Sequence, residues 1–232
     1  MIDGLLRPPA VLVYHGVGSD ADDPARLLVA PDRLESHVRY LQRRGYRFLT
    51  AEELLELGRP SARTAVLTFD DGFRNWLSEA VPLLNRLGVR ATFYICPGMF
   101  GGQHWQVPGE AGRLLDEAGV RALADAGMEL GSHSLSHPDL RKLDDGELAA
   151  ELRESKEAVE RITGSPCRTF AYPFGLYDET VTQAVAEAGY ELAFAWLPGP
   201  WQPLAAPRLP APPRHGPVRL ALKLAGLRRP GR

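Results

Sequence analysis

The feature that most limits the fold is an alternation of short apolar runs with stretches of helical periodicity. The apolar runs predict seven strands, at Ala10–Tyr14, Arg47–Leu49, Thr64–Phe69, Ala91–Cys96, Met128–Ser132, Thr169–Tyr172 and Glu191–Trp196. Amphipathic stretches lie between them and stop at glycines such as Gly45, Gly88 and Gly164, as helices commonly do. Strands that alternate with helices predict an α/β fold with a parallel sheet. Periodicity alone does not distinguish an open sheet from a closed barrel.

Length, composition and charge exclude several classes of protein. The chain has 232 residues, 44% of them hydrophobic, which suits one barrel or two small domains. Its net charge of −2 argues against a nucleic-acid partner, which usually requires a basic surface. No apolar run reaches the roughly 18 residues of a membrane span, and no signal-peptide pattern is seen at the N-terminus. We therefore expect a cytoplasmic protein.

Charge is distributed unevenly along the chain. Seven basic residues and no acidic residue follow Glu191, which leaves 20 basic against 29 acidic residues before that point. The stretch 198–217 is rich in proline and predicts an extended segment that leads to a last helix at 218–227. We favour docking of this helix on the fold through Val218, Ala221, Leu222 and Ala225. The alternative is peripheral contact of the basic C-terminus with an anionic membrane.

Reactive side chains follow three of the predicted strands. The third strand ends in the pair Asp70 and Asp71, the fifth leads to His133 and His137, and the first leads to His15. Carboxyl ends of parallel strands meet at one edge, where α/β proteins place their active sites. Two imidazoles and one carboxylate can hold a metal ion and leave positions open for water and substrate. The pattern predicts a catalytic metal site.

The adjacent carboxylates can divide two tasks between them. Because Gly72 lets the backbone turn sharply, Asp71 can ligate the metal while Asp70 stays off it and takes a proton from water. A nearby cation would also relieve the repulsion between the two charges. The plainer alternative is a carboxylate pair at a helix N-terminus, which explains one aspartate better than two.

The segments TFDDG, HSLSH and YPFG in a chain of βα repeats resemble the polysaccharide deacetylases, the NodB-homology group known as carbohydrate esterase family 4. The resemblance covers nearly the whole chain and is closest to the subgroup acting on poly-N-acetylglucosamine. It implies a distorted (β/α) barrel of about seven parallel strands at 1–197, with 198–232 packed on the same domain. It also implies metal-dependent N-deacetylation of amino sugars in a polysaccharide, oligosaccharide or lipid-linked glycan, with release of acetate.

Position by position, the resemblance implies roles for individual residues. Asp70 matches the catalytic base, and Asp71, His133 and His137 match the ligands of one divalent ion, with zinc as first candidate and nickel, cobalt or iron as others. The turn that lines the sugar groove matches Tyr172, Pro173, Phe174 and Gly175, and the Phe174 backbone N–H would help hold the oxyanion. We add Trp105, from a stretch rich in Gly and Pro, as a substrate-binding residue.

Two positions depart from the family's pattern. Ala171 stands where many members have an Arg that orients the base, so this support is expected to be missing. The late Leu-x-His motif of the general acid is also absent, and that region has only His215. The resembling subgroup has its acid in an early YH sequence, so we assign the acid to His15. We do not assign the acid to His37, which is expected on a surface helix, or to His104, which is expected in a Gly-rich loop that offers no rigid platform.

Three other functions fit part of the pattern. A non-haem iron oxygenase also uses two His and one carboxylate, but it gives the second aspartate no task and its fold is rich in β-structure. A non-catalytic sugar-binding relative would not need all four metal and base positions. An amide hydrolase of the same superfamily acting on small non-sugar amides differs in groove shape rather than motif, so it stays open.

Overall fold

A parallel sheet forms the centre of the protein. The computed structural model describes residues 9–19, 23–58, 63–196, 199–211 and 216–226. The strands of the main sheet are β1 (Ala10–Tyr14), β4 (Arg47–Leu49), β5 (Thr64–Phe69), β6 (Thr92–Ile95), β7 (Glu129–Ser132), β8 (Thr169–Ala171), β9 (Leu192–Ala195), β10 (Ala206–Pro207) and β11 (Leu209–Pro210). A small second sheet pairs β2 (Gly16–Val17) with β3 (Leu28–Val29). The seven predicted strands are all confirmed, and their ends differ by at most one residue.

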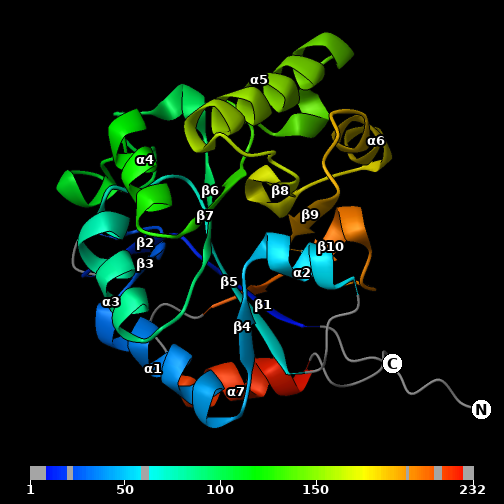
Figure 1. Ribbon diagram of the computed structural model, residues 1–232. Coiled ribbons are helices and arrows are strands. Elements are labelled where there is room, and N and C mark those ends of the chain that lie inside the picture. The colour runs from blue at the N-terminus through cyan, green and yellow to red at the C-terminus, as the bar shows by residue number, and fades with distance from the viewer. Residues whose placement is uncertain (1–8, 20–22, 59–62, 197–198, 212–215, 227–232) are drawn as a thin grey trace, which may run out of the picture.

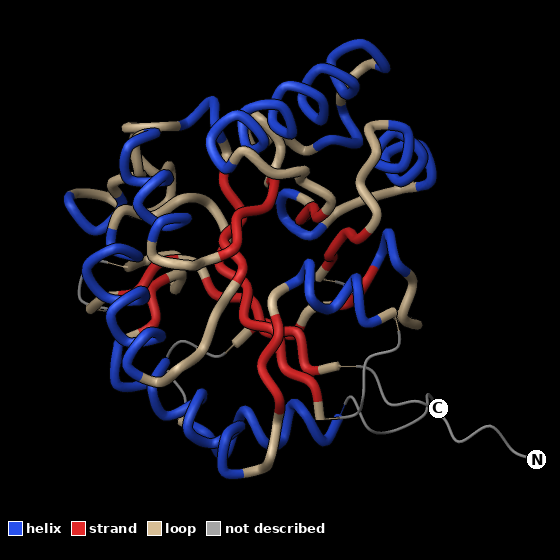
Figure 2. The backbone as a smooth tube through the Cα atoms, viewed as in Figure 1, coloured by secondary structure: helices blue, strands red, loops and turns tan. Residues whose placement is uncertain are grey.

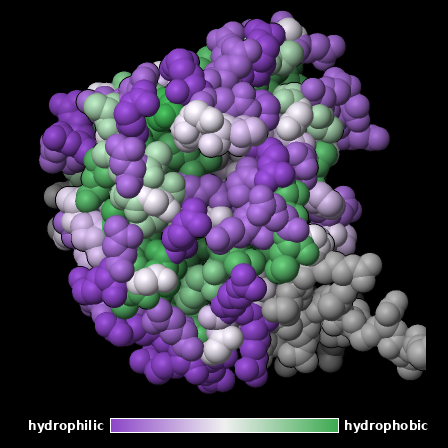
Figure 3. Space-filling view, viewed as in Figure 1, coloured by the Kyte–Doolittle hydropathy of each residue, from purple (hydrophilic) through white to green (hydrophobic). Residues whose placement is uncertain are grey.

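Helices surround the sheet, as Figures 1 and 2 show. They are α1 (Pro31–Arg43), α2 (Ala51–Leu57), α3 (Val81–Arg86), α4 (Glu117–Asp125), α5 (Asp145–Thr163), α6 (Glu179–Glu187) and α7 (Pro217–Gly226). Local sequence explains their ends: Thr50 and Glu53 form a capping box at the start of α2, and Gly164 ends α5 in a left-handed conformation. Hydrophilic side chains cover much of the face in Figure 3, including the outer surface of α5.

The strand order makes the sheet an almost closed barrel. It runs β10-β9-β8-β7-β6-β5-β1-β11, with β4 also paired to β5, and every pairing is parallel. The strands at its two ends, β10 and β11, are separated in sequence by Arg208 alone. The chain therefore steps across the seam of the barrel at this residue. The expected distorted (β/α) barrel is confirmed.

Two short strands of the proline-rich segment, β10 and β11, thus belong to the sheet itself. Ala206 pairs with Phe194 of β9, and Leu209 pairs with Leu12 of β1. Two-residue strands beside prolines have no alternation of apolar and polar residues, so the sequence pattern predicted only an extended segment here. The boundary expected between residues 197 and 198 therefore does not mark an edge of the sheet, because β10 and β11 lie beyond it and belong to the sheet.

The last helix docks through a different face from the predicted one. Leu220 and Leu224 of α7 are buried, whereas Val218 and Leu222 are 75% and 68% exposed. This corrects the expectation that Val218 and Leu222 face the barrel. Residue 227 of the predicted helix, like Arg228 and Arg229, lies outside the described residues. Within the described part of the chain, no helix is both long and apolar enough to cross a bilayer.

Candidate metal and catalytic site

The reactive side chains meet at the carboxyl ends of the strands. Asp70 and Asp71 follow β5, His133 follows β7 and His15 follows β1, so the parallel pairing of β1, β5, β6 and β7 brings them to one edge. Asp71 and Gly72 both have positive φ, at 84° and 90°. This left-handed turn leaves the strand direction at once, and it is how two adjacent carboxylates enter the same site.

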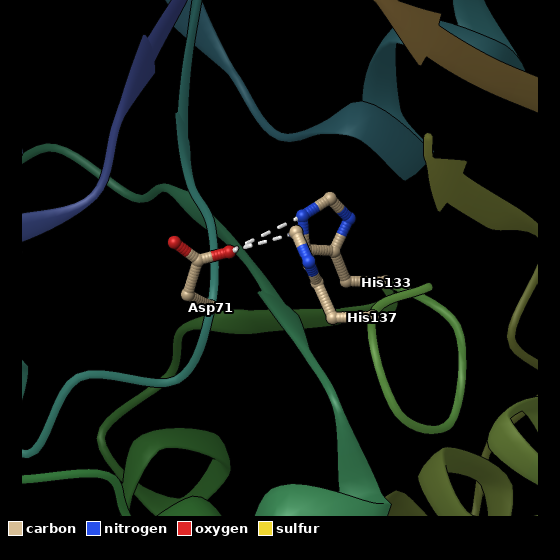
Figure 4. A group of neighbouring side chains, drawn as sticks. All are labelled: Asp71, His133 and His137. Atoms are coloured by element: carbon tan, nitrogen blue, oxygen red, sulfur yellow. Dashed lines mark ion pairs between the residues drawn. The ribbon is translucent and has the colours of Figure 1, made fainter. Parts of the chain in front are cut away.

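Asp71, His133 and His137 point toward one another (Figure 4). Asp71 Oδ1 lies 3.4 Å from Nε2 of His133 and 3.4 Å from Nε2 of His137. The three ligand atoms lie within 4.8 Å of one another. Asp71 Oδ1 is buried, and no hydrogen-bond donor reaches it in the described part of the chain. A buried carboxylate oxygen that faces two imidazole nitrogens suits a divalent cation.

A hydrogen bond orients the imidazole of His133, and burial keeps that of His137 neutral. His133 Nδ1 lies 2.6 Å from the carbonyl oxygen of Ala171, so Nδ1–H donates to it and Nε2 faces the cluster. Burial, with His133 nearby, lowers the pKa of His137 to about 4, which keeps its imidazole neutral at pH 7. Burial opposes ionisation of Asp71, but a hydrogen bond from His104 and the surrounding histidines hold its pKa well below the usual value.

The loop that carries His137 is held from two sides. Glu151 of α5 accepts hydrogen bonds from the backbone N–H groups of Leu135 and Ser136, at 2.8 and 2.9 Å. Gly98 N–H donates to the Leu135 carbonyl at 2.8 Å. His137 itself has a φ of 61°, a conformation that costs free energy for a non-glycine residue. The clamps from Glu151 and Gly98 maintain it.

Arg208 supports Asp70, and this corrects the expectation that base-orienting support is missing. Its Nη1 and Nη2 donate to Oδ1 and Oδ2 of Asp70, each at 2.7 Å, and both side chains are buried. Nη1 also lies 3.1 Å from Thr68 Oγ1. The sequence reading counted Arg208 among the basic residues of the C-terminal segment. Its position between Pro207 and Leu209 carries no motif, so only the closing of the barrel reveals its role.

His15 lies at the mouth of the same site. Its Nε2 is 3.9 Å from Asp71 Oδ2, and its ring meets Trp196 edge to face at 5.8 Å between centroids. Burial lowers the pKa of His15, although the charges of Asp71 and Asp70 act in the opposite direction. A cavity of about 250 Å³ joins His15 to Asp70, Asp71, His133 and His137.

Exposed aromatic rings border this cavity. Trp105, Phe174 and Trp196 line it and are 47%, 42% and 37% exposed. The backbone of Phe174 has a φ of 57°, a left-handed conformation that is uncommon for a non-glycine residue. Gly175, with a φ of 65°, is required where it stands, because a Cβ there would lie 2.4 Å from Cβ of Trp196. Phe174, Gly175 and Trp105 therefore line the cavity that contains the reactive side chains, and their role in binding substrate stays a prediction.

Four placements differ from expectation. Tyr172 and Pro173 are buried and do not line the cavity. The Tyr172 hydroxyl donates to the Leu204 carbonyl at 2.8 Å, so Tyr172 supports the turn from behind. His37 is buried and lies 3.2 Å from the Tyr14 hydroxyl, rather than on the surface. His104 is also buried, with Nε2 3.1 Å from Asp71 Oδ2. His215 lies outside the described residues.

Comparison with known proteins decides the family. A family model described as polysaccharide deacetylase matches residues 58–193, more than half of the chain. The chain belongs to the polysaccharide deacetylase family. This family consists of carbohydrate-esterase hydrolases, and the matched stretch contains Asp70, Asp71, His133 and His137, the positions that the motif reading assigned.

Individual polysaccharide deacetylases show the same likeness. YxkH of Bacillus subtilis, provisionally named a polysaccharide deacetylase, is 27% identical over 82% of this chain and 64% of its own. Peptidoglycan-N-acetylmuramic acid deacetylase PdaA of the same species is 28% identical over 60% of this chain and 48% of its own. The matches thus span less than two thirds of these relatives. The Streptococcus pyogenes deacetylase PplD, solved with acetate, has a TM-score of 0.81 at 24% identity, covering 94% of this chain and 99% of its own, which shows a shared fold.

Proposed function

We propose that this protein removes acetyl groups from N-acetylated amino sugars with the help of one divalent ion. The observation that carries the proposal is a division between two neighbouring carboxylates. Asp71 Oδ1 lies 3.4 Å from Nε2 of both His133 and His137, whereas Asp70 lies farther from His133 Nε2, at 3.8 Å. Both oxygens of Asp70 are instead bound by Nη1 and Nη2 of Arg208. Amide hydrolysis needs an electrophilic centre and a separate base. Asp71 would help to hold the ion that provides the first, and Asp70 would be the second.

Asp71, His133 and His137 would hold the ion. When bound, a divalent ion supplies Lewis-acid chemistry to the amide carbonyl and makes the attacking water more acidic. The donor set of two imidazoles and one carboxylate leaves room for water and substrate and suits zinc, nickel, cobalt or iron. Zinc is our first candidate.

The protein's own groups move the protons. Asp70 accepts the proton of the attacking water, and Arg208 holds its carboxylate in position. His15 then donates a proton to the leaving amine, which is a poor leaving group unless protonated. The Phe174 backbone N–H would stabilise the negative charge that develops on the carbonyl oxygen.

The rim of the cavity favours a sugar over a small non-sugar amide. Three exposed aromatic side chains, Trp105, Phe174 and Trp196, offer flat apolar surfaces around an opening of about 250 Å³. Exposed aromatic rings beside a polar cavity are typical of a binding site for a partly apolar ligand. A small linear amide would leave most of these surfaces without contact.

An acetate-release screen tests the proposal. Purified protein is incubated with oligosaccharides of N-acetylglucosamine, peptidoglycan, lipid-linked N-acetylated sugars and small non-sugar amides, each with and without a chelator. We expect acetate from at least one N-acetylated glycan, loss of release with chelator and recovery on adding zinc. Asp70→Asn is the matched inactive control. Release from small amides alone would support the alternative amide hydrolase.

Peripheral contact with an anionic membrane and a cytoplasmic location stay predictions. What supports the contact is the exposure of Val218 and Leu222 on α7, which also carries Arg219 and Lys223. Co-sedimentation with vesicles of anionic and of neutral lipid at low and high salt tests it. Binding to anionic vesicles should be lost in the double variant Val218→Asp, Leu222→Asp, and equal pelleting with both lipids would contradict it.

A further inference from the structure

One buried histidine near the metal cluster has no part in the chemistry described so far. His104 lies in the loop between β6 and α4, and backbone hydrogen bonds fasten this loop to the turn after β5. Leu115 N–H donates to Gly72 O, and Arg74 N–H donates to Arg113 O, each at 2.8 Å. Within the loop itself, His104 N–H donates to Gly112 O at 2.8 Å. The loop is therefore a fixed platform, contrary to what its glycines suggested.

Hydrogen bonds define the tautomer of His104. Its Nδ1 accepts from the Gln106 backbone N–H at 3.1 Å, which places the ring proton on Nε2. Nε2 lies 3.1 Å from Oδ2 of Asp71, the oxygen that does not face His133 and His137. Nε2–H of His104 thus donates to the outer oxygen of the carboxylate.

This bond fixes how Asp71 is presented. With Oδ2 held by His104, the carboxylate cannot rotate freely, and Oδ1 stays directed at the two imidazoles. Hydrogen bonds to the second atom of a ligating group orient that group and commonly change metal affinity about 10–100-fold. His104 itself is not in the group that could hold the ion, and with both ring nitrogens engaged and its side chain buried it does not reach substrate.

The faces of the His104 ring have a second task. One face stacks on Phe73 at 4.8 Å and 25°, and Trp105 stacks on the ring at 4.1 Å and 18°. Trp105 is 47% exposed at the rim and lies 4.6 Å from the His137 ring between centroids. The edge of one buried imidazole therefore orients a metal ligand while its face supports a surface for substrate.

We infer that His104 is a positioning residue that couples the metal site to the sugar platform, holding Asp71 through Nε2–H and Trp105 through its ring. The inference rests on the proposed function, because it concerns the affinity of Asp71, His133 and His137 for a divalent ion and the binding of a sugar beside Trp105. The two tasks use different parts of the side chain, so two substitutions separate them.

The experiment compares His104→Phe, which keeps a stacking ring and loses the donor, with His104→Gln, which keeps an N–H donor and loses the ring. Zinc affinity of the metal-free proteins is measured by competition with a chromophoric chelator, independently of activity. We expect His104→Phe to bind zinc about 10–100-fold more weakly with little change in KM at saturating zinc. We expect His104→Gln to bind zinc within about threefold of wild type, with a raised KM and greater mobility of Trp105 in fluorescence anisotropy.

A buried histidine elsewhere provides the matched control. His37 is buried and contacts Tyr14, so His37→Phe should leave zinc affinity unchanged, and thermal unfolding of the metal-free proteins reports folding of each variant. Wild-type zinc affinity in His104→Phe, or an equal loss in both His104 variants, would overturn the inference while the proposed function stands. A wild-type protein without zinc affinity would contradict both.

Discussion

Both carboxylate oxygens of Asp70 accept a hydrogen bond from one guanidinium, that of Arg208, at 2.7 Å each. Asp70 follows β5, whereas Arg208 lies 138 residues later, where the chain crosses the seam of the barrel. The Arg208 guanidinium also lies 5.8 Å from the centre of the Tyr94 ring. A bidentate pair of this kind fixes the orientation of a carboxylate. The closing strands of the barrel thus complete the candidate catalytic site.

The first prediction concerns this pair. Arg208→Met should leave Asp70 as a buried carboxylate without its partner, so kcat/KM should fall by about 10²-fold because the base is no longer held in position. Stability should fall by about 3–5 kcal/mol, the usual result of breaking a buried ion pair. Arg208→Lys should retain part of the activity, since an ammonium restores charge without the bidentate geometry. The measurements are kcat/KM and denaturant unfolding.

Arg168 offers the control for the first prediction. It pairs with Glu52 and Glu56, away from the residues that line the cavity. Arg168→Met should leave kcat/KM unchanged. If Arg208→Met had the same kcat/KM as wild type, the arginine would have no role in orienting the base.

The second prediction separates base from ligand. Asp70→Asn should still bind about one equivalent of zinc but lose about 10²–10⁴-fold in kcat, the usual cost of removing a general base. Zinc content of the purified variant and acetate release together measure this. Loss of zinc in parallel with activity would instead make Asp70 a metal ligand.

The third prediction tests the metal ligands directly. His137→Ala should lose zinc, because His137 supplies one of the three candidate ligand atoms that the described residues bring together. Chelator-treated wild type should lose acetate release and recover it when zinc, nickel, cobalt or iron(II) is restored. Full deacetylation by metal-free protein would contradict the metal site.

The fourth prediction concerns His15 as general acid. His15→Ala should keep its zinc and its fold but lose about 10²–10⁴-fold in turnover of N-acetyl substrates. The same variant should lose much less on acetyl esters, because an alkoxide needs less help to leave than an amine. An equal loss on both substrates would point to a binding role, and near wild-type amide turnover would place the acid elsewhere.

The fifth prediction concerns stability at the other end of the barrel. Glu129, at the start of β7, accepts hydrogen bonds from Glu52 N–H and Thr92 Oγ1, and burial raises its pKa to about 7. A raised pKa means that the folded state favours the neutral carboxyl, so the contribution to stability is largest below the unfolded pKa of 4.5 and is lost as pH rises through about 7.

Glu129→Gln should therefore weaken the dependence of the free energy of unfolding on pH between about 4.5 and 7. Denaturant unfolding of the metal-free protein at several pH values measures it. The exposed Glu79→Gln is the control and should keep the wild-type slope. A Glu129→Gln curve parallel to that of wild type would show that this carboxyl titrates alike in both states.

Much of the architecture follows from local patterns in the sequence. Strands such as β5 and β9 are short apolar runs bounded by turn residues, and their identity depends on a few neighbouring side chains. Because all of them pair in parallel, any polar residue just beyond a strand joins the same edge. Asp70, Asp71 and His133 could therefore be grouped from the sequence before any distance was known.

The closing of the barrel and the supports of the site depended on tertiary structure. Arg208 reaches Asp70 only because β10 and β11 pair with opposite ends of the sheet, and His104 reaches Asp71 only because its loop is bonded to the turn after β5. Neither contact leaves a local period or a motif, since each joins residues that are far apart in the chain. The sequence by itself determined which chemical groups this protein has and on which edge they lie. Long-range packing decided which of them orient the others, because that depends on side-chain contacts between distant segments.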